Sequence, residues 1–255
     1  MMLQSLRVCV IIPMYNEEAI AKTSVETILP YLKTLPYPTT LLIVNDGSKD
    51  KTAEIVMTEV ERVEDARRLT MVSHDRNLGY GAGLRTGMHY AIDHGYDYAL
   101  FMDSDLTNHP KYLTLFYSKM AEGCDYIKAT RYRKGGGMEG VPFKRRMFSR
   151  VGNMVGRFLF QLPLSDVTNG FRAVHTDILR KLDLKENGFA IIMEELYQVK
   201  PYVKKFGEVP YVLTQRNIGQ GQTHFSYTLG MIWRYLFFAL KSIFIKYEST
   251  EHYYR

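Results

Sequence analysis

Two carboxylates separated by one residue stand directly after a short apolar run. Residues 98–102 are apolar and aromatic, which predicts a buried strand of a parallel sheet, and Asp103 and Asp105 follow it. In an open α/β sheet, ligands bind just beyond the carboxyl ends of the strands. Carboxylate oxygens there suit Mg²⁺ or Mn²⁺, and such a cation could meet a diphosphate. Paired aspartates are also common on solvated turns, so the rest of the sequence must decide between these interpretations.

The composition fits a compact enzyme with an anionic partner. At 255 residues and 46% hydrophobic content, the chain can bury a full core. Its formal charge of +6 suits a nucleic acid, a membrane surface or a phosphorylated substrate. Cys9 and Cys124 show neither zinc spacing nor a disulfide framework, so we expect a reduced, cytosol-facing compartment. No apolar run reaches about 18 to 20 residues, so we expect neither a signal peptide nor a spanning helix.

The first half of the chain alternates strand-like and helix-like segments. Asp50 is the candidate N-cap of the second helix, and Pro36 ends the first. The expected strands cover residues 8–12, 40–44, 69–73 and 98–102, and the expected helices cover residues 17–35, 51–64 and 80–94. This order predicts an α/β fold with a mostly parallel central sheet, right-handed crossovers and flanking helices.

Polar turns follow three of the predicted strands, at residues 13–18, 45–50 and 103–107. We expect these turns to face one crevice, where carboxylates can accept hydrogen bonds from a base or ribose and helix-start amides can face phosphate. The glycines of residues 79–83 have the spacing Gly-x-Gly-x-Gly and follow the third strand, which favours close backbone approach over a dinucleotide site. The crevice is therefore predicted to bind a nucleotide.

Several motifs occur in a fixed order along the chain. The first four are Ile12-Pro13-Met14-Tyr15-Asn16-Glu17, Asn45-Asp46-Gly47-Ser48, Asn77-Leu78-Gly79-Tyr80-Gly81 and Asp103-Ser104-Asp105. The later ones are Arg131-Tyr132, Arg145-Arg146-Met147-Phe148-Ser149, Asp166-Val167-Thr168-Asn169-Gly170-Phe171-Arg172 and Glu208-Val209-Pro210. The first set resembles the inverting family 2 glycosyltransferases, whose GT-A fold binds a sugar nucleotide. The second resembles their polyprenyl-phosphate glycosyltransferase subgroup, which includes dolichol-phosphate mannose synthases.

The resemblance implies a role for each matching residue. The implied nucleotide-binding residues are Pro13, Tyr15, Glu17, Asp46, Asp103 and Ser104. The implied catalytic residues are Asp103, Asp105 and Arg216, of which Arg216 would close over the phosphates. Mg²⁺ or Mn²⁺ would be bound by Asp103 and Asp105, with the Thr107 hydroxyl as a weaker third ligand where relatives often have Gln. Asn45 also departs from the family, since relatives commonly have Asp there.

Residues 131–157 contain eight Lys and Arg, opposed only by Glu139. Such a run is either a solvated basic face or a clamp for an acceptor phosphate, because guanidinium groups bind phosphate oxygens in pairs. The glycines at residues 135–137 predict a flexible loop between Tyr132 and Pro142. The resemblance assigns the acceptor phosphate to Arg131 and Arg146, and also to His224, which stands where relatives often have Lys.

Two further acidic residues, Asp166 and Glu194, are open to two interpretations. Asp166 precedes a predicted turn at residues 169–170, and Glu194 falls in a predicted helix. Each could position the sugar or nearby backbone, or it could transfer a proton.

Aromatic and aliphatic residues dominate residues 227–247, interrupted by Arg234, Lys241 and Lys246. An interfacial membrane helix has this composition, and so does a helix packed on its own domain or on a partner. We expect a GT-A catalytic domain over residues 1–225 and an amphipathic helical extension over residues 226–255. The protein would lie peripherally on the cytoplasmic face of a membrane, meeting the membrane surface or a small membrane partner subunit.

The resemblance implies transfer of a hexose from a sugar nucleotide to polyprenyl or dolichyl phosphate with inversion. GDP-mannose is the first expected donor and UDP-glucose the second. Two alternatives stay open: a family 2 enzyme acting on a polysaccharide or glycolipid, and a non-catalytic subunit that binds a sugar nucleotide. Nucleic acid is not an expected partner, because the basic run has no recognised binding motif and few interleaved aromatics.

Overall fold

The computed structural model describes residues 6–65, 67–215 and 228–247. Its strands are β1 (Val8–Met14), β2 (Thr39–Asn45), β3 (Leu69–Ser73), β4 (Tyr98–Phe101), β5 (Tyr126–Thr130), β6 (Gly137–Met138), β7 (Arg172–His175), β8 (Phe206–Pro210) and β9 (Val212–Leu213). Its helices are α1 (Ala21–Lys33), α2 (Thr52–Arg62), α3 (Tyr80–Asp93), the short η1 (Pro110–Tyr112), α4 (Leu113–Ala121), α5 (Phe143–Phe160), α6 (Thr176–Leu179), α7 (Ile191–Val199) and α8 (Leu229–Ser242).

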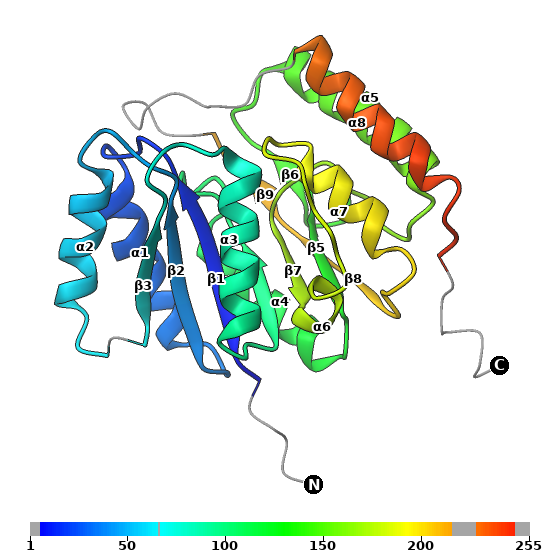
Figure 1. Cartoon of the computed structure of the whole chain (residues 1–255). Coiled ribbons are helices and arrows are strands. Elements are labelled where there is room, and N and C mark those ends of the chain that lie inside the picture. Colours follow the sequence, from blue (N-terminus) through cyan, green and yellow to red (C-terminus); the bar gives the residue numbers. More distant parts are fainter. Residues whose placement is uncertain (1–5, 66, 216–227, 248–255) are drawn as a thin grey trace, which may run out of the picture.

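A seven-stranded sheet in the order β3-β2-β1-β4-β7-β5-β8 forms the centre of the molecule (Figure 1). β1 pairs in parallel with β2 and β4, whereas β7 runs antiparallel to β4 and β5. The parallel strands β1, β2 and β4 therefore end at the same edge, where the three polar turns follow them. The predicted α/β fold with a mostly parallel sheet is confirmed.

Hydrophobic side chains cover both faces of the sheet, because successive residues of a strand point to opposite faces. One buried cluster joins Ile11 of β1 to Leu84 of α3 and extends to α7 and α8. The other joins Ile12 of β1 to Ile28 of α1 and extends to α4. Since helices close both faces, the strand ends are left as the accessible edge of the sheet.

The first helix begins at Ala21, later than the expected residue 17. Asn16 has a positive φ of 51°, and its amide donates to the Ser48 hydroxyl at 3.0 Å. The Glu18 amide donates to the Asp50 carboxylate at 3.1 Å. These bonds hold the turn after β1 against the turn after β2, so the chain completes the crevice wall before it becomes helical.

The structure differs from the two remaining local predictions. The N-cap of α2 is Lys51, one residue after the predicted Asp50, although the Asp50 carboxylate accepts a hydrogen bond from the amide of Thr52, the first residue of α2, at 3.0 Å. The flexible loop expected between Tyr132 and Pro142 contains a short strand. Gly137 and Met138 form β6, which pairs in parallel with β9, and the Gly137 amide donates to the Tyr211 carbonyl at 3.0 Å.

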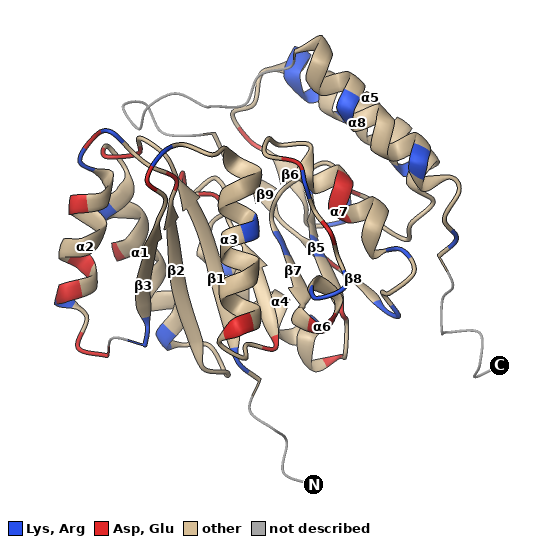
Figure 2. Ribbon diagram, viewed as in Figure 1, with Lys and Arg blue, Asp and Glu red and all other residues tan. Residues whose placement is uncertain are grey.

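Helices α5 and α8 lie side by side at one end of the molecule (Figure 1). Lys and Arg are spread along this pair, whereas several acidic residues lie on α2 at the other end (Figure 2). No helix in the described ranges is long and apolar enough to cross a membrane.

Candidate active site

The turns after β1, β2 and β4 open into one cavity of about 1130 Å³. Ligand pockets commonly measure about 300–1000 Å³, so this cavity has room for two substrates. The predicted site residues that line it are Pro13, Tyr15, Glu17, Asp46, Asp103, Ser104, Asp105, Thr107 and Arg131. Arg146 is not part of the described lining, and Arg216 and His224 lie outside the described residues.

Hydrogen bonds orient the paired carboxylates of Asp103 and Asp105. The Asn108 amide nitrogen donates to Oδ2 of Asp103 at 2.8 Å, and the Tyr80 hydroxyl reaches Oδ1 at 3.4 Å. Thr107 donates to Oδ1 of Asp105 from its amide at 3.0 Å and from its hydroxyl at 2.7 Å. The Thr107 hydroxyl, expected as a metal ligand, thus positions Asp105. Asn108 was missed in the sequence, although it stands only five residues after Asp103.

The surroundings of Asp103 disfavour the ionised form of its carboxyl group. Burial, and then the charge of Asp105, raise the pKa of Asp103 to about 6. A divalent cation would offset this repulsion, and Mg²⁺ commonly uses one or two carboxylates with substrate phosphate and water as its other ligands. No cluster of three His, Cys, Asp or Glu suited to a metal occurs in the described part of the chain. The two carboxylates are thus donors of the kind that a divalent cation takes from a protein when its other ligands come from elsewhere.

Asp46 is buried, and its carboxylate holds in place the glycine-rich turn, residues 77–83. It accepts hydrogen bonds from the amides of Leu78 and Gly79, each at 2.8 Å. The His74 ring contacts Asp46 Oδ1 through Nδ1 at 2.7 Å and the Thr86 hydroxyl through Nε2 at 2.8 Å. Asp46 thus fixes the start of α3 beside the crevice. His74 was missed in the sequence, and its place directly after β3 is the signal that could have found it.

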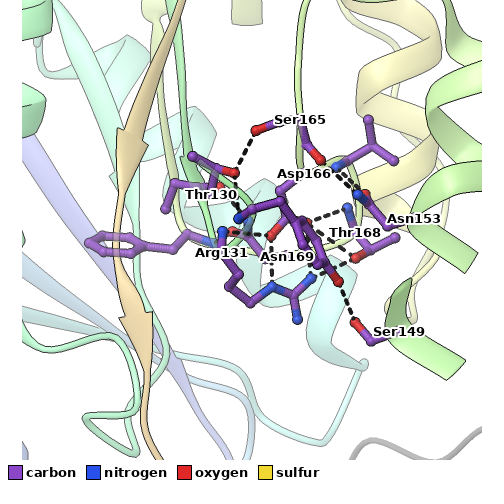
Figure 3. A network of polar contacts seen from close by, with 12 residues as sticks. Thr130, Arg131, Ser149, Asn153, Ser165, Asp166, Thr168 and Asn169 are labelled. Atoms are coloured by element: carbon purple, nitrogen blue, oxygen red, sulfur yellow. Dashed lines mark hydrogen bonds and ion pairs between the residues drawn. The ribbon is translucent and has the colours of Figure 1, made fainter. Parts of the chain in front are cut away.

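Arg131 is bound to the protein through most of its guanidinium group (Figure 3). Its Nε and Nη2 atoms bond the Asp166 carboxylate at 2.7 and 2.9 Å, and Nη2 also donates to the Thr168 hydroxyl at 2.8 Å. Burial alone would raise the pKa of Asp166, but the charge and hydrogen bonds of Arg131 lower it. Of the two interpretations of Asp166, these contacts favour positioning over proton transfer.

Glu194 also has a positioning geometry. Its carboxylate accepts hydrogen bonds from the Lys185 amide at 2.9 Å and the Glu186 amide at 2.9 Å. It therefore anchors the loop between α6 and α7 to the start of α7.

The neighbouring arginines of α5 point in different directions. Arg145 lines the cavity, whereas Nη2 of Arg146 donates to the Met138 carbonyl at 2.9 Å. The predicted Arg146 thus lies next to the arginine that is part of the cavity lining. Adjacent residues of a helix point about 100° apart, so only the orientation of α5 distinguishes them.

A buried ion pair supports the end of β4 from behind. Arg172 and Glu195 are both buried, and the two nitrogens of Arg172 contact the two oxygens of Glu195 at 2.5 Å. The Arg172 guanidinium lies 4.3 Å from the centre of the Phe101 ring and donates to the Gly170 carbonyl at 2.8 Å. Because Phe101 is two residues before Asp103, this pair holds the backbone that carries the carboxylates.

The cavity becomes apolar where it passes between α5 and α8. Its lining there comes from Val151 and Val155 of α5, Ile232 and Leu236 of α8, and Met193 of α7. The cavity thus joins a polar end at the sheet edge to an apolar end between two helices.

Solved structures define the class of fold. A crystal structure of glucosyl-3-phosphoglycerate synthase from Mycobacterium tuberculosis, in complex with Mn²⁺, UDP and phosphoglyceric acid, matches with a TM-score of 0.67 at 18% identity. The match covers 94% of this chain and 79% of that chain. The chain has a GT-A-like fold, as predicted.

Residues 9–183 match the model of Glycosyl transferase family 2, and the chain belongs to this family of glycosyltransferases. The polyprenol monophosphomannose synthase of Mycolicibacterium smegmatis is 27% identical over 84% of this chain and 79% of its own length. The undecaprenyl-phosphate mannosyltransferase of Micrococcus luteus is 28% identical over 85% of this chain and 87% of its own length. The dolichol-phosphate mannosyltransferase of Pyrococcus furiosus is 29% identical over 87% of this chain, which spans 62% of that protein. The predicted family is confirmed.

The raised pKa of Asp103 predicts how the stability of the metal-free protein changes with pH. Its pKa is higher folded (about 6) than ordinarily (3.8), so the folded protein binds more protons in this interval and its stability falls as pH rises through it. Asp103→Asn should therefore raise the free energy of unfolding at pH 7 by on the order of 1 kcal/mol, allowing for solvent screening, and flatten this slope. Urea unfolding between pH 4 and pH 7 in a chelator measures both effects.

The exposed Asp93 on α3 supplies the control for this experiment, and Asp93→Asn should leave stability and its slope close to those of wild type. An Asp103→Asn protein no more stable than wild type at pH 7 would contradict the prediction.

Proposed function

We propose that this chain transfers mannose from GDP-mannose to a polyprenyl or dolichyl phosphate with inversion, and that UDP-glucose is the second candidate donor. One observation carries the proposal: a single cavity runs from the Asp103 and Asp105 carboxylates, past Arg145, to an apolar end between α5 and α8. A substrate pair with a nucleotide diphosphate at one end and a lipid phosphate at the other matches these features. The names of the mannosyl-transferring relatives support mannose as the sugar.

Asp103 and Asp105 would hold Mg²⁺ or Mn²⁺, whose chemistry when bound is to stabilise negative charge on the departing diphosphate. Asn108 and Thr107 keep the two carboxylates oriented for this role. An oxygen of the acceptor phosphate attacks the anomeric carbon opposite the diphosphate, and the new C–O bond forms as the bond to the nucleoside diphosphate breaks. A phosphate monoester has a second pKa of about 6, so the attacking oxygen is largely ionised at neutral pH and needs little help from a base.

The acceptor phosphate would be bound by Arg145 at the start of α5. Arg145 lines the cavity, whereas the charge of Arg131 is balanced by Asp166 and the Arg146 side chain bonds the Met138 carbonyl. Arg131 would then form a fixed wall of the phosphate site, and Arg146 would hold α5 against β6. Arg216 and His224 remain predicted contributors to phosphate binding.

The α5–α8 pair would place the protein on a membrane. Exposed apolar residues recur at helical spacing on each helix: Phe143, Met147, Met154 and Phe158 on α5, and Trp233, Phe237 and Leu240 on α8. Lys144, Arg150 and Arg157 of α5 are exposed beside them. Apolar side chains next to cations suit the interface of a membrane with anionic lipid, and the alternative is a small membrane partner subunit. The free cysteines fit the cytoplasmic face.

The two alternatives are less well supported. A polysaccharide acceptor would leave the apolar end of the cavity, including Ile232 and Leu236, without a matching substrate. A non-catalytic subunit would have no need for two carboxylates held close enough to raise the pKa of Asp103. The division into a catalytic domain over residues 1–225 and an extension over residues 226–255 is part of the same proposal.

A donor panel tests the function. The protein is incubated with GDP- and UDP-sugars and a short polyprenyl phosphate, with and without a chelator, and product mass is measured. We expect polyprenyl-phosphate mannose from GDP-mannose only when the metal is available. Asp105→Ala should lower kcat/KM by at least about 100-fold, and Asp93→Ala should not. Absence of transfer to the lipid phosphate from every donor would reject the proposal.

Paired variants of α5 test the acceptor site. Arg145→Gln should raise KM for polyprenyl phosphate about tenfold or more and leave KM for the donor unchanged, because a hydrogen bond to a charged group contributes about 1.5–3 kcal/mol. Arg146→Gln is the matched variant and should have the smaller effect on acceptor KM. Steady-state kinetics with each substrate varied in turn measures both KM values. A larger rise in acceptor KM for Arg146→Gln than for Arg145→Gln would assign the phosphate to Arg146 instead.

Vesicle flotation tests the membrane surface. Phe158→Ser and Leu240→Ser should each lower the partition coefficient onto vesicles containing anionic lipid about tenfold, since burying a large apolar side chain contributes about 1.5–3 kcal/mol. Met57→Ser and Leu115→Ser change exposed apolar residues of α2 and α4 and serve as controls. Equal partitioning of all four variants would contradict this surface.

A further inference from the structure

The loop before α7 touches both α8 and the donor crevice. Its residues 186–189, here called the bridging segment, are anchored to α7 by the hydrogen bond from the Glu186 amide to Glu194 at 2.9 Å. The bridging segment was not among the site residues predicted from the sequence. It makes side-chain and backbone hydrogen bonds with α8 on one side and with α3 on the other.

On one side, two consecutive residues of α8 hold the bridging segment. Nη1 of Arg234 lies 2.5 Å from Oε2 of Glu186, and the Tyr235 hydroxyl donates to the Phe189 carbonyl at 3.3 Å. These contacts fix the first half of α8 against the segment.

On the other side, the bridging segment meets the glycine-rich turn. The Gly81 amide donates to the Asn187 carbonyl at 2.7 Å, and Arg85 of α3 donates to the Glu186 carbonyl and the Asn187 side chain. A Cβ atom at Gly81 would overlap the Glu186 carbonyl oxygen, so only glycine allows this approach.

Aromatic stacking then carries the contact to the metal carboxylate. The rings of Phe189 and Tyr80 stack with centroids 4.5 Å apart at 24°, and the Tyr80 hydroxyl reaches Asp103 Oδ1 at 3.4 Å. Gly79, next to Tyr80, donates its amide to Asp46. A displacement of the bridging segment would therefore reach two carboxylates of the crevice.

We propose that the bridging segment couples the packing of α8 against it to nucleotide binding in the donor crevice, with Tyr80 and Phe189 as positioning residues for Asp103. This rests on the proposed function, because it takes α8 as the acceptor and membrane side and Asp103 as the donor side. The coupling is reciprocal. A ligand that stabilises the contacts of α8 with the bridging segment lowers the Kd of the metal–nucleotide complex, and binding of that complex stabilises the contacts of α8 by the same factor.

Hydrogen exchange tests the coupling without any ligand. Arg234→Ala and Tyr235→Phe each remove one contact from α8, and both should raise amide exchange several-fold in residues 186–189 and also in residues 79–81. Lys241→Ala is the matched control on α8, since its contacts are the rings of Tyr197 and Phe237, and it should leave residues 79–81 unchanged. Faster exchange that stops at residues 186–189 would overturn the coupling.

Nucleotide binding tests its functional consequence. Calorimetry with GDP or UDP and Mg²⁺ should show Kd raised about fivefold or more by Arg234→Ala, within the usual range of coupling. In a Phe189→Leu background, Arg234→Ala should have a smaller effect, because the stacking on Tyr80 is already lost and only the hydrogen bonds of Gly81 and Arg85 still join the segment to α3. Unchanged Kd in Arg234→Ala, or full additivity of the two substitutions, would overturn the proposal.

The single tryptophan of the chain supplies the reciprocal measurement. Trp233 stands on α8 next to Arg234, so Mg²⁺ with nucleotide should change its fluorescence in wild type and change it less in Phe189→Leu. An equal response in both proteins would count against the coupling. Asp105→Ala separates the two proposals: if it binds Mg²⁺ and nucleotide as wild type does, the proposed function fails, and the exchange experiment still decides the coupling.

Discussion

The repulsion between Asp103 and Asp105 is the constraint around which the rest of the site is arranged. Asp103 stands at the end of a buried strand, and its burial, followed by the charge of Asp105, raises its pKa. Asn108 and Thr107 donate hydrogen bonds that hold the pair in orientation. Such a site is unfavourable for folding and favourable for a cation, as expected where stability is given up for binding.

Buried ion pairs keep this arrangement rigid. Arg172 with Glu195 supports β4 from within the core, and Arg131 with Asp166 fixes the turn at the far side of the cavity. Each charge has its partner and further hydrogen bonds, which is the condition under which a buried charge is tolerated. The resulting wall has fixed positions for both carboxylates, so little reorganisation is required when a charged substrate arrives.

The helix pair α5 and α8 forms the apolar end of the cavity. It contributes the apolar lining around Val155 and Leu236, and it exposes further apolar residues such as Phe158 to the outside. In the proposed function a lipid phosphate would use both surfaces, because its head would bind at Arg145 while its chain stays out of water. The same pair contacts the loop that stacks on Tyr80, so acceptor and donor sides share one set of contacts.

The sequence alone determined the α/β class, the first four strands along the chain and the polar residues that follow them, because hydrophobic periodicity and the rule that parallel strands share an edge are local or topological. It therefore placed Asp46, Asp103 and Asp105 at one crevice. Tertiary structure decided which side chains turn toward that crevice: Arg145 rather than Arg146, and Arg131 bound to Asp166. The stacking of Phe189 on Tyr80 was likewise out of reach, since it depends on how separate elements pack and no sequence spacing encodes that.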